Sequence, residues 1–255
     1  MAKTALITGA SSGIGLELAY EYAKKHYNLI LIARRRNILN DLKNNIEDKY
    51  GVQVYIFAKD LSKEKSPKDI FESVKKLNIP IDVLINNAGF GKLDEFSEMD
   101  EDLIRNMINV NITALTRLTR LFLPSMKRRR KGKIINISSV AAYFPGPFMA
   151  VYFATKAYVN SLSEALSEEL KSYGIKVFAI CPGPTRTGFQ DVAGMKRLNL
   201  KGIPSAKDLA KYTIKISGTS KRVAIYGISN KINSIIARIL PKKLVLFSIS
   251  KVNGK

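Results

Sequence analysis

The chain has 255 residues, 46% of them hydrophobic, and its 42 Lys and Arg exceed its 21 Asp and Glu to give a formal net charge of +21. This length and hydrophobic content suffice for a single folded domain with a sizeable core. The one cysteine, Cys181, excludes a disulfide within the chain, and the one histidine, His26, argues against a His-based zinc site or a Ser-His-Asp triad, so we expect no metal.

The chain starts with MAKTALITG, which lacks the charged and apolar leader of a secreted protein. The most apolar stretch near the C-terminus, residues 244–249, is far shorter than the roughly 20 residues that a spanning helix needs. We therefore expect a cytoplasmic protein that is not integral to a membrane.

The positive charge is unevenly distributed along the chain. Residues 196–255 hold 11 Lys and 3 Arg against one acid, Asp208, and a second basic cluster, KRRRKGK, occupies residues 127–133. A solvated basic surface, contact with an anionic membrane and contact with nucleic acid are the alternative explanations. Nucleic acid is the least favoured of the three.

Short apolar runs alternate with amphipathic stretches. The runs rich in Val and Ile occupy residues 4–8, 29–33, 52–58, 83–86, 133–138, 177–180 and 223–227. Residues 15–26 and 161–174 have helical periodicity, and Gly174 is typical of a helix C-terminus. Strands that alternate with helices predict a doubly wound α/β fold, with a mostly parallel sheet of about seven strands flanked by helices. We expect one domain over residues 1–230 and an extension over 231–255.

Ligands of such folds bind outside the carboxyl ends of the strands, where the strand order changes direction. Segments that follow strands, such as 9–15, 34–36, 86–89 and 182–188, are therefore expected together at one edge of the sheet. The basic cluster 127–133 precedes a strand and is expected at the opposite edge.

Residues 8–15 read TGASSGIG and stand between the first strand and the first helix. Glycines let the backbone turn tightly and approach a pyrophosphate, and a helix N-terminus offers it free N–H groups. The spacing G-x-x-x-G-x-G departs from the usual fingerprint G-x-G-x-x-G, but the strand-turn-helix context still predicts a dinucleotide site. The expected contacts come from Gly9, Ser11, Ser12, Gly13, Ile14 and Gly15.

Three arginines follow the second strand, and no carboxylate occurs before Asp41. At this place an acid binds the ribose 2′-hydroxyl of NAD, whereas an arginine accommodates the 2′-phosphate of NADP. Because an acid would repel that phosphate and a guanidinium binds it with paired donors, Arg34 and Arg35 predict NADP(H). Arg36 is expected to be a solvated helix residue.

The segment YFATK places Tyr152 and Lys156 four residues apart, on one face of a helix. A tyrosine hydroxyl has a pKa near 10, and a nearby ammonium group lowers that pKa toward a useful range. Ser139 follows the strand before this helix and can donate its hydroxyl to a substrate oxygen. The three residues predict an acid-base site.

Taken in order, these motifs resemble the classical subgroup of the short-chain dehydrogenase/reductase family, from the first strand to about residue 190. The resemblance rests on T-G-x-x-x-G-x-G at 8–15, N-N-A-G at 86–89, the Tyr-x-x-x-Lys pair and P-G-x-x-x-T at 182–187. It implies a Rossmann fold and catalytic roles for Asn111, Ser139, Tyr152 and Lys156. It implies further cofactor contacts from Asp60, Leu61, Asn87, Ala88, Gly89, Tyr152, Lys156, Pro182, Gly183 and Thr187.

By this resemblance, hydride passes from the nicotinamide to a substrate carbonyl carbon while Tyr152 protonates the oxygen. Ser139 would orient that oxygen, and Lys156 would hold the nicotinamide ribose and lower the tyrosine pKa. Asn111 would help to position a water that relays protons. The family also implies a homodimer or homotetramer.

The expected substrate is an apolar ketone, such as a fatty acyl, steroid-like or aromatic carbonyl compound. The expected lining comes from Phe90, Tyr143, Phe144, Pro145, Phe148 and Met149, and from a lid at about 188–203 with Phe189, Val192, Met195 and Leu198. The sequence thus predicts an NADP(H)-dependent carbonyl reductase or alcohol dehydrogenase. The alternative is a protein without turnover, either a cofactor-sensing regulator or a nucleic-acid-binding module, which the unsubstituted catalytic positions disfavour.

The extension 231–255 is basic and amphipathic, with Ile232, Ile235, Ile236, Ile239 and Leu240 on one helical face. We expect this segment to pack against the body of the protein itself. A cover over the active site, an oligomer interface and peripheral contact with an anionic membrane are the other possibilities.

Overall fold

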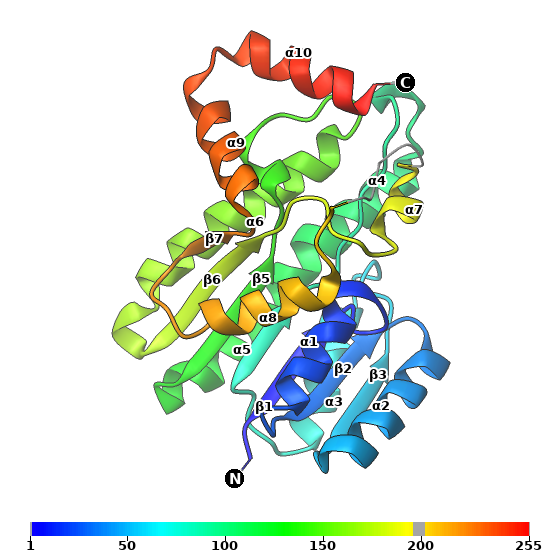
Figure 1. Ribbon diagram of the computed structural model, residues 1–255. Helices are drawn as coiled ribbons and strands as arrows, with labels where there is room; N and C mark the ends of the chain where they lie inside the picture. The colour runs from blue at the N-terminus through cyan, green and yellow to red at the C-terminus, as the bar shows by residue number, and fades with distance from the viewer. Residues whose placement is uncertain (1, 196–201, 255) are drawn as a thin grey trace.

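The computed structural model describes residues 2–195 and 202–254 (Figure 1). The strands are β1 (Thr4–Thr8), β2 (Asn28–Ala33), β3 (Val54–Ala58), β4 (Val83–Asn86), β5 (Gly132–Ile137), β6 (Ile175–Cys181) and β7 (Val223–Ile225). The helices are α1 (Gly13–Ala23), α2 (Arg36–Tyr50), α3 (Ser66–Lys76), α4 (Glu101–Ile108), α5 (Leu115–Arg129), α6 (Ala150–Glu169), α7 (Phe189–Ala193), α8 (Ala206–Ile216), α9 (Ile228–Ile239) and α10 (Lys242–Asn253). Short helical turns are η1 (Phe96–Glu98), η2 (Asn109–Ala114), η3 (Val140–Tyr143) and η4 (Lys171–Tyr173).

The strands form one seven-stranded sheet in the order β3-β2-β1-β4-β5-β6-β7, and every neighbouring pair is parallel. The order reverses between β1 and β4, so the ligand-binding crevice of a doubly wound sheet lies beyond the carboxyl ends of these two strands. The predicted α/β fold and strand number are confirmed.

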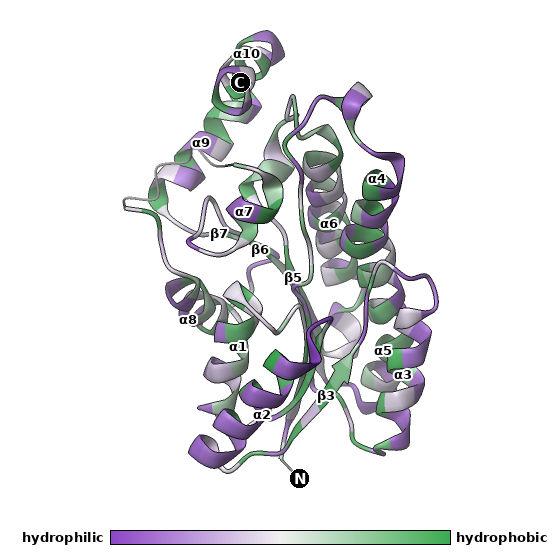
Figure 2. Cartoon of the chain, turned by 90° about the vertical axis from the view of Figure 1, so that its right-hand side faces the viewer, coloured by the Kyte–Doolittle hydropathy of each residue, from purple (hydrophilic) through white to green (hydrophobic). Residues whose placement is uncertain are grey.

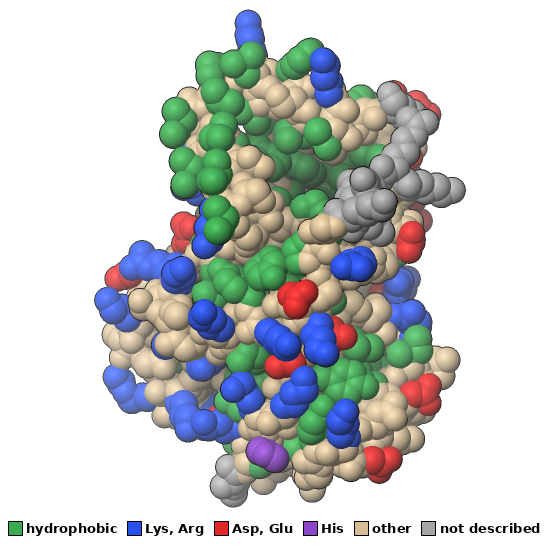
Figure 3. Space-filling view, viewed as in Figure 1, with side chains coloured by type: hydrophobic (Ala, Val, Ile, Leu, Met, Phe, Trp, Pro, Cys, Tyr) green, Lys and Arg blue, Asp and Glu red, His purple; other side chains and the backbone are tan. Residues whose placement is uncertain are grey.

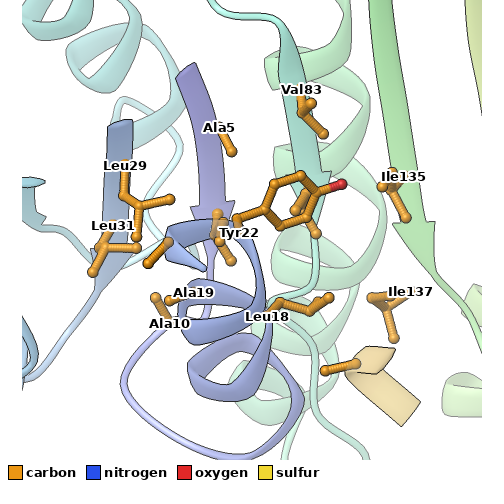
Figure 4. Packing of buried hydrophobic residues seen from close by; sticks show 14 of the residues in the cluster. Ala5, Ala10, Leu18, Ala19, Tyr22, Leu29, Leu31, Val83, Ile135 and Ile137 are labelled. Carbon is orange, nitrogen blue, oxygen red and sulfur yellow. The ribbon is translucent and has the colours of Figure 1, made fainter. Parts of the chain in front are cut away.

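The core consists of two apolar layers, one on each face of the sheet. Helices α1, α2 and α8 cover one face and α3 and α5 the other (Figure 2). Along β2, Leu29 and Leu31 pack into the first layer and Ile30 and Ile32 into the second, which explains why the strand has no polar alternation. On the first face, Tyr22 of α1 lies across the central strands (Figure 4).

Several element boundaries differ from the expected ones. The predicted helix 161–174 is the end of α6, which stops at Glu169; η4 follows, and Gly174 ends that turn with a φ of 67°. The first helix ends at Ala23, and His26 lies in the following turn with a φ of 54°. In both cases the local turn replaces the last helical residues that periodicity suggested.

Residues 228–254, here called the C-terminal arm, form α9 and α10, which meet at Pro241 and project beyond the carboxyl edge of the sheet (Figure 1). The extension does contact the body of the protein, but not through the apolar residues of its first helix. The side chains of Ile235 and Ile239 are 58% and 77% exposed, while the buried residue of α9 is Ser234. The helix turns its polar side to the protein and its apolar side outward.

Among the described residues, no helix combines the length and the hydropathy that crossing a bilayer requires.

Candidate active site

Glycines shape the turn after β1 at positions where a side chain does not fit. Gly9 and Gly13 have φ angles of 67° and 55°, which residues with a Cβ rarely adopt. A Cβ on Gly15 would lie 2.3 Å from the carbonyl oxygen of Gly9, so α1 packs directly on the turn. The N-cap of α1, Ser12, makes no side-chain capping hydrogen bond, which leaves the first N–H groups of the helix to an anion. Ile14, in the first turn of α1, packs on the core of the first face. The turn therefore fits a dinucleotide pyrophosphate.

Two side chains hold this turn against the end of β4. Thr8 Oγ1 accepts hydrogen bonds from the N–H groups of Asn87 at 2.9 Å and Ala88 at 3.0 Å. Asn87 Nδ2 donates in return to the carbonyl oxygens of Thr8 at 2.9 Å and Gly9 at 3.3 Å. The N-N-A-G segment thus fixes the shape of the glycine turn at the switch point of the sheet.

The two arginines after β2 have different surroundings. Arg35 reaches the glycine turn, where its Nη2 donates to Ser11 Oγ at 3.0 Å and to the Ser11 carbonyl oxygen at 3.1 Å. Arg34 is exposed and makes no hydrogen bond or ion pair with another described residue. Arg35 therefore connects the two predicted cofactor segments, and Arg34 leaves its guanidinium available to a phosphate.

Asp60 and Leu61 follow β3. Asp60 Oδ1 accepts a hydrogen bond from the Ser62 N–H at 3.0 Å, while Leu61 is buried in the core of the second face. These contacts fix the loop beside the end of β2. The family resemblance implies that the adenine of the cofactor binds there.

The segment after β6 closes the other side of the crevice. The Pro182 carbonyl oxygen accepts from the Val140 N–H at 2.9 Å, and Gly183 lies against the side chain of Asn230. Thr187 lies against the glycine turn, because a Cβ on Gly13 would come within 3.3 Å of its side chain. The structure thus brings the first and last predicted cofactor segments together.

Ser139 and Tyr152 meet beyond the end of β5. Ser139 caps η3, where its Oγ accepts from the Ala141 N–H at 3.1 Å. Burial raises the pKa of Tyr152 to about 12, and a hydrogen bond with Ser139 opposes that rise. The hydroxyl of Tyr152 is therefore protonated at neutral pH and able to donate.

Lys156 lies one helical turn beyond Tyr152 and is also buried. Its Nζ is 5.7 Å from the centroid of the Tyr152 ring and donates to the Ile137 carbonyl oxygen at 2.9 Å. Burial lowers the pKa of Lys156 to about 8. The expectation that Lys156 lowers the pKa of Tyr152 is not met in the protein alone, because burial of the phenol dominates and the opposing contact comes from Ser139.

Asn111 lies in η2, one turn of π-helix that interrupts the helical run from α4 to α5. Its Oδ1 accepts from the Phe90 N–H at 3.1 Å, and its Nδ2 donates to the Phe90 carbonyl oxygen at 2.9 Å and to Thr155 Oγ1 at 3.0 Å. A Cβ on Gly89 would come within 3.1 Å of Asn111 Oδ1 and 3.3 Å of Lys156 Nζ. The four predicted catalytic side chains therefore converge on one place.

Thr155 is a site residue that the sequence analysis missed. Its hydroxyl donates to the Tyr152 carbonyl oxygen at 2.7 Å and accepts from Asn111. It links the π turn to α6 and is 1% exposed. The available signal was a hydroxyl residue directly before Lys156 inside a helix.

An apolar cluster surrounds the ring of Tyr152. The centroids of the Tyr152 and Phe189 rings are 5.3 Å apart, and a Cβ on Gly91 would come within 2.9 Å of the tyrosine ring. Of the predicted lining, this cluster includes Phe90, Phe144, Met149, Phe189 and Met195. Figure 3 shows a hollow lined by hydrophobic side chains below the C-terminal arm.

Other predicted lining residues have different positions. Pro145 and Val192 are exposed, and the hydroxyl of Tyr143 points to Cys181 Sγ at 4.0 Å. Phe148 adopts a φ of 61° just before α6. Leu198 lies outside the described residues.

The comparisons with known proteins agree with this arrangement. A family model described as short chain dehydrogenase matches residues 3–197. Very-long-chain 3-oxoacyl-CoA reductase of Mus musculus is 35% identical over 251 residues, which cover 95% of this chain and 78% of that protein. Inactive hydroxysteroid dehydrogenase-like protein 1 of Pongo abelii is 32% identical over 253 residues, which cover 98% of this chain and 76% of that protein.

A solved structure gives the same result. The short-chain dehydrogenase from Sphingobium yanoikuyae in complex with NADPH has a TM-score of 0.84 and 31% identity, and the match covers 95% of each chain. Since the matched family model spans both the glycine turn and the Tyr-x-x-x-Lys pair, the chain belongs to the short-chain dehydrogenase family, as its motifs predicted, and is an oxidoreductase of CH–OH and C=O groups.

Proposed function

We propose that this protein uses NADPH to reduce the 3-oxo group of a long-chain acyl thioester such as a 3-oxoacyl-CoA. The observation that carries the proposal is the buried Tyr152, protonated beside Ser139 at the wall of an apolar cluster. The reductase relative from Mus musculus supports the substrate class, and the NADPH complex of the Sphingobium yanoikuyae dehydrogenase supports the cofactor.

The four converging side chains divide the work at the carbonyl group. NADPH, when bound, supplies the hydride. Tyr152 donates its hydroxyl proton to the carbonyl oxygen as negative charge develops there, and Ser139 orients the same oxygen with a hydrogen bond. The ammonium of Lys156 stabilises the phenolate that Tyr152 becomes. Asn111 acts through Phe90 and Thr155, which it holds in position.

An acyl-CoA combines a long apolar chain with a polyanionic head, and the region around the site offers partners for both. The apolar cluster around Tyr152 suits the acyl chain. The guanidinium of Arg238 lies 4.9 Å from the centroid of the Tyr143 ring. Tyr143 belongs to η3, the short turn that Ser139 caps. It supplies a positive charge near the site for a phosphate of the head group.

The reaction is tested by NADPH oxidation with 3-oxoacyl-CoA substrates of increasing chain length. Each added methylene that enters an apolar site contributes about 0.8 kcal/mol, so kcat/KM is expected to rise about three- to fourfold per carbon until the site is filled. Absence of oxidation at every chain length by a protein that binds NADPH would favour the cofactor-sensing alternative.

Arg34→Ala is expected to weaken NADPH binding about 10- to 150-fold, because a charge-assisted hydrogen bond contributes about 1.5–3 kcal/mol. NADH affinity should change little, since NADH lacks the 2′-phosphate. Arg35→Ala should weaken both cofactors, because Arg35 also holds Ser11 in the glycine turn. Titration of nicotinamide fluorescence measures all four affinities.

Arg36→Ala is the matched control for these variants, since Arg36 is the exposed first residue of α2. It should leave both affinities unchanged. Equal loss of NADPH binding in the Arg34 and Arg36 variants would contradict a specific phosphate contact. The cytoplasmic location and the homodimer or homotetramer stay predictions.

A further inference from the structure

The outward face of α9 is a continuous apolar stripe. Its five residues repeat at helical spacing and are between 43% and 77% exposed: Ile228, Ile232, Ile235, Ile236 and Ile239. The opposite side of the helix buries Ser234 and places Asn230 against Gly183. An exposed isoleucine stripe of this size marks an interaction surface.

Helix α10 repeats the arrangement. Val245 and Asn253 are buried, and Asn253 Nδ2 donates to the Pro147 carbonyl oxygen at 3.0 Å, which fixes the helix to the segment before α6. Leu244, Phe247 and Val252 remain 52–71% exposed. The arm is thus held by one side of each helix and leaves apolar residues of both helices in solvent.

Every charged side chain of the C-terminal arm is positive. They are Lys231, Arg238, Lys242, Lys243 and Lys251, and the chain contains no acid after Asp208. The ammonium of Lys251 lies 4.5 Å from the centroid of the exposed Phe247 ring. Apolar and cationic groups therefore share the same surface. Figure 3 shows the hydrophobic side chains gathered over α9 at the upper left, with basic side chains at the top of the arm.

We propose that the C-terminal arm docks on the surface of a membrane that contains anionic phospholipids. The isoleucine stripe would enter the boundary between head groups and acyl chains, and the lysines would bind lipid phosphates. A second copy of the chain is a poorer occupant, because symmetric pairing would oppose two surfaces of the same positive sign with no acid to pair them.

Docking would also place the substrate site near the lipid. Ile249 of α10 packs on the apolar cluster around Tyr152, and Arg238 of α9 stacks on Tyr143. An apolar substrate held in the bilayer would then enter beside the arm. This last step rests on the proposed function, whereas docking itself does not.

The apolar part of the proposal is tested by flotation of the full chain with vesicles of phosphatidylcholine and phosphatidylglycerol. Ile235→Ser/Ile239→Ser should lower vesicle binding at least about tenfold, because each isoleucine loses its transfer into the interface. The matched control is Phe96→Ser/Ile108→Ser, two exposed apolar residues outside the arm, which should bind like the wild type. Unchanged NADPH affinity shows that each variant is folded.

The cationic part is tested with Lys242→Gln/Lys243→Gln. At about 1 kcal/mol for each basic residue at an anionic surface, this variant should bind about 30-fold more weakly. Arg128→Gln/Lys131→Gln removes two exposed charges at the opposite edge of the sheet and should have no such effect. Pure phosphatidylcholine vesicles should bind the wild type weakly.

Three results would overturn the proposal. One is equal vesicle binding by the wild type and both arm variants. The second is equal binding to vesicles with and without phosphatidylglycerol. The third is a wild-type dimer that does not bind vesicles and becomes monomeric in Ile235→Ser/Ile239→Ser, which would assign the stripe to self-association. Because the readout is binding, none of these results depends on turnover of a 3-oxoacyl-CoA.

Discussion

Tyr152→Phe is expected to lower the rate of NADPH-dependent carbonyl reduction about 10²- to 10⁴-fold, the usual contribution of a positioned acid. The pKa of Tyr152 is about 12, so the wild-type side chain is protonated and donates throughout the neutral range. Phenylalanine keeps the ring that packs against Gly91 and Phe189 and removes only the hydroxyl. Cofactor affinity and the free energy of unfolding should therefore change little.

Tyr158→Phe is the matched control, because Tyr158 lies on the same helix and its hydroxyl hydrogen-bonds only to Thr116 among the described residues, at 2.9 Å. Steady-state NADPH oxidation and a fluorescence titration of NADPH should be run on both variants. A Tyr152→Phe enzyme that retains most of the wild-type rate would exclude Tyr152 as the acid.

The sheet was predictable because its strands are short apolar runs buried on both faces. The errors are local. Residues 52 and 53 were expected in a strand, but the strand begins at Val54, because the Gln53 N–H donates to the side-chain Oδ1 of Asn28 and not to the backbone of β2. Such side-chain contacts compete with strand pairing, and periodicity does not register them.

The parts of the candidate site that consist of short sequence motifs were predictable. The contacts between residues far apart in the sequence were not. The Arg35–Ser11 contact joins residues 24 positions apart, and the Asn111–Thr155 contact joins residues 44 apart. The pKa of Tyr152 follows from burial, which a sequence does not show. For the C-terminal arm, the helical periodicity predicted the isoleucine stripe but not that it faces outward. An apolar stripe can face either the protein or an outside partner, and the sequence does not distinguish the two.

Lys156→Met is expected to lower turnover at least about 100-fold and to change the pH dependence of stability. The pKa of Lys156 is about 8 in the folded protein against 10.5 for an ordinary lysine. Between these values the unfolded chain binds more protons than the folded one, so the free energy of unfolding rises with pH in this window. The shift corresponds to about 3 kcal/mol. Below pH 8 the free energy of unfolding of the wild type is lower by this amount, because the folded protein must keep a charged ammonium group buried.

Methionine has a similar shape and no charge, so the variant should lack this rise. Its free energy of unfolding at pH 7 should equal or exceed that of the wild type by up to about 2 kcal/mol, since the Ile137 carbonyl oxygen loses its partner at a cost of about 1–3 kcal/mol. Urea unfolding of both proteins from pH 7 to 10 measures this difference in the free energy of unfolding. The raised pKa of Tyr152 lowers stability only above about pH 10, so Tyr152 does not affect the comparison in this range. A parallel pH dependence in the two proteins would show that Lys156 is not desolvated. If the variant becomes more stable than the wild type as the pH falls, then the buried lysine that catalysis requires lowers the stability of the folded protein.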